Sequence, residues 1–193
     1  MEVKLSREEL IKRIHSGYCL FKYYDLSGLD LSGLDVTDIL FEHCNLSSVD
    51  FSKSKLKKVN FEYCCMNYVN FSQSTLKELS FKYCELWRSK FSGSKSADIT
   101  FLRANMNESN FSKSGLYDTY FQYCSLLYSK FLDSVICGSM FNHSKLARLD
   151  LSGAHLDSVE FNFCCCRSVN TDNIKTIDSN LEKAIKTGGV YAT

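Results

Sequence analysis

The chain has 193 residues, enough for one domain with a continuous core, and its formal net charge of +1 gives no overall field that would favour nucleic acid or a basic partner. No apolar run reaches the roughly 18–20 residues that a membrane helix needs, and the charged N-terminal stretch lacks the hydrophobic segment of a signal peptide. We therefore expect a cytoplasmic protein in which the ten cysteines stay reduced.

Residues 1–16 are predicted to form a helical cap. Ser6 and Glu9 have the spacing of a capping box, and Gly17 is a suitable end for a helix over about 7–15. A stacked repeat needs its open end covered. The apolar residues that this helix would lay over the next structure are Leu10, Ile11 and Ile14.

A strict five-residue period occupies residues 17–173. Among the 30 positions from 21 to 166 whose numbers end in 1 or 6, only Ser96 and Cys166 are not large and apolar, and 13 of the 14 Phe residues lie there. This period fits neither a helix nor a single strand, so it indicates a repeating unit that turns. Ser96 predicts a local irregularity or a small polar void.

The neighbouring positions predict the shape of the unit. Two residues before each large side chain the residue is small, usually Cys or Ser, and residues two apart in an extended segment face the same side. The residue between them points outward and is often Asp or Asn, while the remaining two positions turn the chain. Each unit therefore buries two side chains.

A second period, four times as long as the first, sets the number of units in a turn. Cysteine recurs at the small position in Cys44, Cys64 and Cys84, and an outward aromatic recurs in Tyr63 and Tyr83. With four units in each turn, residues of the same type would stack on one another in successive turns. We expect a four-sided coil of about eight turns, spaced about 4.8 Å apart, with columns of Phe inside.

The segments Tyr24–Gly28, Leu29–Gly33 and Leu149–Gly153, which read YDLSG, LDLSG and LDLSG, resemble the repeat unit of the pentapeptide-repeat family. The resemblance covers about four fifths of the chain. It implies an all-β fold, a right-handed quadrilateral β-helix. Many central positions are Phe rather than Leu, and Lys or Tyr replaces Gly at many corners, which changes the surface and the packing but not the coil.

Residues 174–193 are predicted to contain a C-terminal helix and tail. Ser179 and Glu182 have the spacing of a second capping box, and Gly188-Gly189 would end the helix. The helix either caps the last turn or pairs with a second copy, since some members of the family dimerise through a C-terminal helix. Its apolar residues recur at helical spacing in Ile174, Ile177, Leu181, Ala184 and Ile185.

No catalytic or metal site is predicted, and no cofactor. Cys164 and Cys166 point inward while Cys165 points outward, so neighbouring thiols cannot converge on one metal ion. The Cys44, Cys64 and Cys84 column lies within Cα range for disulfides, but parallel Cβ vectors and a reducing compartment favour free, buried thiols. A filled rod also lacks the cavity that an enzyme generally needs.

Two surface features are candidate interaction sites. The outward aromatics either stabilise the sheet by stacking or form a protein-binding surface. The lysines either protect sheet edges and solubility or bind an acidic partner or RNA. The aromatic set is Tyr63, Tyr83, Tyr123, Tyr68, Trp87 and Tyr128. The basic set is Lys53, Lys55, Lys57, Lys58, Lys77, Lys95 and Lys113.

These observations favour a non-catalytic protein-binding or scaffold module over an enzyme. The resemblance supplies an alternative, because some pentapeptide-repeat proteins mimic DNA, bind type II topoisomerases such as gyrase and confer quinolone resistance. DNA mimicry needs a strongly negative surface, whereas the charge here is +1, and no loop interrupts the repeat. We expect another protein as partner, with a homodimer through the C-terminal helix as a further alternative, and neither nucleic acid nor a membrane.

Overall fold

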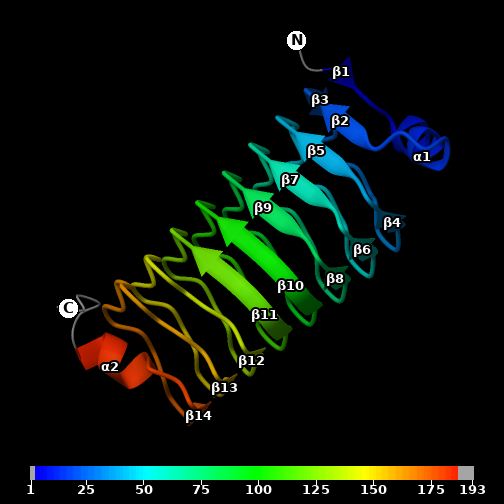
Figure 1. Ribbon diagram of the computed structural model, residues 1–193. Helices are drawn as coiled ribbons and strands as arrows, with labels where there is room; N and C mark the ends of the chain where they lie inside the picture. The colour runs from blue at the N-terminus through cyan, green and yellow to red at the C-terminus, as the bar shows by residue number, and fades with distance from the viewer. Residues whose placement is uncertain (1–2, 187–193) are drawn as a thin grey trace.

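The structure is a computed structural model that describes residues 3–186 (Figure 1). The backbone winds as a stack of parallel turns, a β-solenoid, with a short helix at each end. The helices are α1 (Arg7–His15) and α2 (Leu181–Lys186). The strands are β1 (Val3–Lys4), β2 (Leu20–Lys22), β3 (Tyr24–Asp25), β4 (Asp35–Thr37), β5 (Leu40–Glu42), β6 (Lys55–Lys57), β7 (Asn60–Glu62), β8 (Thr75–Lys77), β9 (Ser80–Lys82), β10 (Lys95–Leu102), β11 (Gly115–Gln122), β12 (Val135–Cys137), β13 (His155–Asp157) and β14 (Lys175–Ile177).

Each turn has four sides and brings the chain back above its starting point. Phe41 pairs with Phe61, and Phe61 pairs with Phe81, always in parallel, so one turn takes four five-residue units. We number the sides from one turn: side 1 is 44–47, side 2 is 49–52, side 3 is 54–57 and side 4 is 59–62. Residues that differ by 20 in number lie on the same side. On side 1 the bridges run from β1 through β3 to Cys165, which makes about nine levels.

The corners between sides share one backbone conformation. From Tyr23 to Asp178, every fifth residue has a positive φ, between 47° and 71°. Glycine adopts this left-handed conformation without strain, yet most corners here carry Lys, Tyr, Asp or another side chain. The preceding Asp and Asn side chains help to form the turn, as when Asp30 Oδ1 accepts a hydrogen bond of 2.9 Å from the backbone N–H of Ser32. The predicted four-sided coil is therefore confirmed.

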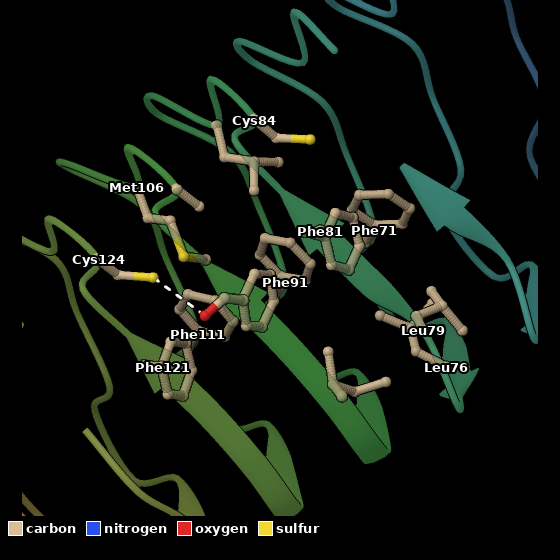
Figure 2. Close-up of a cluster of buried hydrophobic side chains, with 14 of the residues drawn as sticks. Phe71, Leu76, Leu79, Phe81, Cys84, Phe91, Met106, Phe111, Phe121 and Cys124 are labelled. Carbon is tan, nitrogen blue, oxygen red and sulfur yellow. Dashed lines mark hydrogen bonds between the residues drawn. The ribbon is translucent and has the colours of Figure 1, made fainter. Parts of the chain in front are cut away.

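The interior is filled by two columns of Phe (Figure 2). On side 4, Phe41 and Phe61 stack with ring centroids 5.4 Å apart, and on side 2 Phe51 and Phe71 stack at 5.1 Å. The two columns meet edge to face. All 13 Phe residues of the five-residue period are buried, as predicted, and Phe163 is about half exposed at 48%. The buried Ser96 pairs in register with Leu76 and Leu116, so the predicted irregularity does not appear in the pairing.

Helix α1 covers the first turn. Ser6 caps it by accepting a hydrogen bond from the N–H of Glu9, and Gly17 follows with a φ of 85°. Leu10 is fully buried and Ile14 packs against the core, while Ile11 is partly exposed. Neither helix within residues 3–186 is long and apolar enough to cross a membrane.

The C-terminal helix starts later than its sequence pattern predicts. Ile174 and Ile177 do not lie on a helix, because the repeat continues past 173: β14 pairs with β13, and Asp178 forms another corner with a φ of 47°. Helix α2 begins at Leu181 and buries Leu181 and Ala184. Gly188-Gly189 lies outside the described residues.

Candidate interaction surface

Outward side chains form a continuous column along the corner between side 4 and side 1. Tyr63 and Tyr83 stack with ring centroids 4.8 Å apart and ring planes within 3°. Each ring stands on a left-handed corner residue, so the spacing of the turns sets the spacing of the rings. We call this set the aromatic column: Tyr23, His43, Tyr63, Tyr83, Arg103, Tyr123, His143 and Phe163.

Both histidines in this corner belong to the column. The His43 ring lies 5.2 Å from the ring of Tyr23 and 5.0 Å from that of Tyr63, and the His143 ring lies 4.8 Å from that of Tyr123 and 4.7 Å from that of Phe163. Of this column, the sequence interpretation proposed only Tyr63, Tyr83 and Tyr123 as an interaction surface. The longer period carried the signal for the histidines, since His43 precedes Tyr63 by one turn.

Arg103 joins the two halves of the column. Its guanidinium carbon lies 5.9 Å from the ring centroid of Tyr83 and 5.7 Å from that of Tyr123, within the range of cation–π contacts. Tyr63 and Tyr123 are nevertheless about half exposed, at 51% and 53%. Because neighbours cover the ring faces, the column presents ring edges and phenol hydroxyls to solvent.

Tyr68 and Trp87 form a second cluster near the corner between side 1 and side 2. Their rings meet edge to face at 5.0 Å, and the Arg88 guanidinium lies 4.3 Å from the Trp87 ring centroid. Glu108 accepts hydrogen bonds from Arg88 Nε at 2.7 Å and from Trp87 Nε1 at 3.2 Å. The hydrogen bond from Arg88, reinforced by that from Trp87, lowers the pKa of Glu108.

Tyr128 lies outside this second cluster. It stands on the same corner but three turns beyond Tyr68, and its neighbour is Arg148, whose guanidinium carbon lies 5.2 Å from the Tyr128 ring centroid. The structure therefore divides the six predicted aromatic residues among the aromatic column, the Tyr68 and Trp87 cluster, and this separate pair.

The predicted basic residues gather on side 3 and its two corners. All are exposed, and Lys57 pairs directly with Lys77 across adjacent strands. A row of carboxylates on the corner between side 3 and side 4 partly neutralises them, and Glu78 lies 4.0 Å from Lys58 and 3.8 Å from Lys77. The sequence interpretation missed this row, although its members recur in step with the turns. They are Asp38, Glu78, Asp98 and Asp118.

The buried thiols of side 1 act as hydrogen-bond donors. Cys44, Cys64 and Cys84 each donate to a backbone carbonyl oxygen of the preceding turn, with S···O distances of 3.2, 3.3 and 3.4 Å. All ten cysteines are free. Cys164 and Cys166 are buried and Cys165 is exposed, as predicted. Within the described residues, no three His, Cys, Asp or Glu side chains are grouped to hold a metal ion.

A hollow of about 650 Å³ lies at the C-terminal end of the stack. Its apolar lining includes Ile174, Leu181 and Ile185, and its charged lining comes only from α2. Glu182 and Lys186 of that helix form an exposed ion pair of 3.6 Å. Within the described residues this arrangement offers an apolar contact surface.

A parallel solenoid with four five-residue sides and left-handed corners defines the class as a quadrilateral β-helix. The family model described as pentapeptide repeat region matches residues 34–111. A corner residue with a positive φ recurs at every fifth position without interruption from Tyr23 to Asp178. Residues 34–111 therefore form a pentapeptide-repeat region, and the rest of the solenoid continues the same fold.

Solved structures share this fold at low sequence identity. A trypsin-treated variant of QnrB1, a plasmid-mediated fluoroquinolone resistance protein, is 18% identical, with 90% of each chain covered and a TM-score of 0.52. HetL, a pentapeptide-repeat protein involved in heterocyst differentiation regulation in the cyanobacterium Nostoc sp. strain PCC 7120, is 14% identical, with 91% of this chain and 94% of HetL covered and a TM-score of 0.46. No curated protein sequence matches the chain.

Proposed function

We propose that this protein is a non-catalytic scaffold that binds another protein through its rigid outer surface. The observation that carries this proposal is the aromatic column, which spans eight turns of the solenoid. Tyrosine is enriched among the residues that dominate protein–protein binding energy. A column of half-exposed Tyr side chains is therefore suited to protein contact.

The column is ordered before any partner binds. Each ring is held between its neighbours, and each corner residue is held by bridges between turns on the adjoining sides. Since ordering a side chain at an interface costs free energy, a pre-ordered row of rings lowers the cost of association. The filled Phe interior supports the same proposal, because it leaves the outer surface as the place for function.

Affinity capture with quantitative mass spectrometry tests this function. The test variant carries Tyr63→Ser, Tyr83→Ser and Tyr123→Ser together. The matched control is Tyr117→Ser, which removes a phenol of 45% exposure from side 3, outside the column. We expect a protein captured by the wild type and by the control to be lost by the test variant. Equal capture by all three proteins would contradict the role of the column.

A topoisomerase-binding function is a second candidate, favoured by the fold shared with QnrB1 over 90% of both chains. The net charge of +1 argues against a DNA mimic. Because corner residues recur at every fifth position from Tyr23 to Asp178, no loop is inserted between these residues. A gyrase supercoiling assay with and without a quinolone tests it. If the protein at micromolar concentration neither inhibits gyrase nor protects it from the quinolone, this candidate is rejected.

The C-terminal end is the proposed site of any homodimer. Ile177 and Ile185 are exposed at 50% and 37% beside the hollow at α2. Pairing two such ends would bury these side chains. Light scattering after size exclusion gives the mass directly, and a monomer over the micromolar range would reject the dimer.

A further inference from the structure

The C-terminal half of side 1 carries an uncompensated cluster of cations that the lysine pattern of the sequence did not reveal. We call it the basic face, and its residues are Arg103, Lys145, Arg148 and Arg167. All four are exposed, and within residues 3–186 none of them forms an ion pair. The guanidinium groups of Arg103 and Arg148 lie against aromatic rings.

Carboxylates are scarce within the basic face, although Asp150 lines the depression beside Arg148 and Glu85 pairs with Asn105 one turn before the face. Among residues 103–108, 123–128, 143–148 and 163–168, which make up this part of side 1 and its corners, Glu108 is the one acidic residue. Arg88 and Trp87 already occupy the oxygens of Glu108. The basic face therefore differs from the lysines of side 3, which lie beside a row of carboxylates.

The surface between these cations is hollowed. A depression of about 340 Å³ lies between Arg103 and Lys145, with Tyr123 and His143 in its wall. Its floor and the adjoining surface carry small side chains, including Ser125 and Ala147, that are only partly exposed. A second depression of about 620 Å³ meets the face at Arg148.

The cations are spread along the solenoid axis. Lys145 and Arg148 lie in the same turn, and Lys145 bridges to Cys165, so Arg167 lies one turn further on. Arg103 lies two turns before Lys145. At about 4.8 Å for each turn the face is roughly 14 Å long, close to the length of about ten helical residues.

We propose that the basic face binds an acidic segment of a partner protein, an inference that rests on the proposed function and names the chemistry of the partner. Guanidinium groups bind carboxylates through two parallel hydrogen bonds. Single-stranded nucleic acid would need open ring faces for its bases, whereas the rings of Tyr123 and His143 beside this face are covered by neighbouring rings and by Arg103. The charges and the covered rings together favour carboxylates over nucleotides.

Fluorescence anisotropy with a labelled poly-glutamate peptide of about 12 residues tests the proposal at low salt, since such attraction is screened at higher ionic strength. The test variant is Arg148→Glu with Arg167→Glu. The matched control is Lys55→Glu with Lys57→Glu, which makes the same change in net charge on side 3. We expect the test variant to raise the peptide Kd about tenfold or more and the control to raise it less than about threefold.

A milder variant, Arg148→Gln with Arg167→Gln, should raise the Kd by an intermediate factor, and thermal melts establish that every variant is folded. Equal losses in the test variant and the control would overturn the proposal, because only net charge would then matter. Tighter binding of a 12-nucleotide oligo-dT than of the peptide would also overturn it.

The capture experiment separates this inference from the proposed function. If the arginine variant keeps both the peptide and the captured partner while the tyrosine variant loses the partner, the basic face is rejected and the scaffold function stands. If both variants capture the same proteins as the wild type, the scaffold function is rejected as well.

Discussion

The thiol of Cys124 donates a hydrogen bond of 3.3 Å to the carbonyl oxygen of Phe101 in the preceding turn (Figure 2). Ser144 makes the equivalent bond to Phe121 through its hydroxyl at 3.0 Å. Cysteine and serine at this position therefore make equivalent hydrogen bonds, which link each turn to the preceding turn. Ala104 stands in the same column and shows that the bond is not required at every level.

Stability should fall at high pH because of the buried thiols. Burial raises the pKa of Cys124 to about 12, whereas an unfolded thiol has a pKa of about 8.5. Between these values the folded state keeps a proton that the unfolded state loses, so the free energy of unfolding falls as pH rises. Cys124→Ala should reduce that slope by up to about 1.4 kcal/mol per pH unit between pH 9 and 11, measured by urea unfolding.

The control for the pH experiment is Cys165→Ala. Cys165 lies on the same side as Cys124 but is exposed, so its replacement removes a thiol without removing a buried one. Identical slopes for the wild type and Cys124→Ala would contradict the assignment of a protonated, buried thiol.

Phe101→Ala should cost about 3–5 kcal/mol of unfolding free energy, because the Phe101 ring is buried between the rings of Phe81 and Phe121. Thermal and urea melts measure the loss. Phe163→Ala is the matched control, since the same atoms are removed from a half-exposed ring and the loss should be smaller. Equal losses would place the two rings in equivalent environments and refute the buried assignment.

The positive φ at a corner position should make a substitution there cost more for some residue types than for others. Gln73 is exposed with a φ of 60°, so Gln73→Val, which places a β-branched residue in the left-handed region, should cost about 1–2 kcal/mol. Gln73→Gly should be tolerated, since glycine adopts this φ freely. Lys55→Val introduces the same branched side chain at an exposed strand position, and urea melts that rank it with Gln73→Val would exclude backbone strain as the cause.

Arg103 should be replaceable by a ring but not by a carboxylate. Arg103→Tyr would complete the stack between Tyr83 and Tyr123 and should keep or raise stability, while Arg103→Glu should lose about 0.5–1 kcal/mol of cation–π attraction. Thermal melts at matched salt report both. A carboxylate as stable as the tyrosine would show that the contact contributes nothing.

The coil could be predicted because its period is written directly in the apolar residues. A large side chain at every fifth position reaches the interior, and the longer period of matching residues defines the four-sided turn. The small residues at Cys44 and Cys64 predicted buried thiols in the same way. Neither period predicts which carbonyl oxygen accepts the hydrogen bond from each thiol. That oxygen belongs to the preceding turn, and its position depends on how one turn is rotated relative to the next.

The C-terminal boundary was wrong because two patterns coincide there. Ile174, Ile177 and Leu181 have helical spacing, yet Ile174 also occupies the small inward position of the repeat. Strand pairing between β13 and β14 decides in favour of the repeat. The acidic row and the basic face were missed for a different reason. Clusters of charge become visible only when residues 20 positions apart are compared, since residues close in sequence lie on different sides of the solenoid.

The two periods have unequal consequences for insertions and deletions. Removing one five-residue unit at a corner keeps every later ring inside the rod but turns the remaining surface by a quarter. Tyr123, His143 and Phe163 would then leave the line of Tyr63 and Tyr83 and continue along an adjacent edge. Duplicating one complete turn would instead lengthen the same line by one rung. A change of length by one unit therefore moves the later part of the aromatic column to another corner, whereas a change by a whole turn keeps the column in one line.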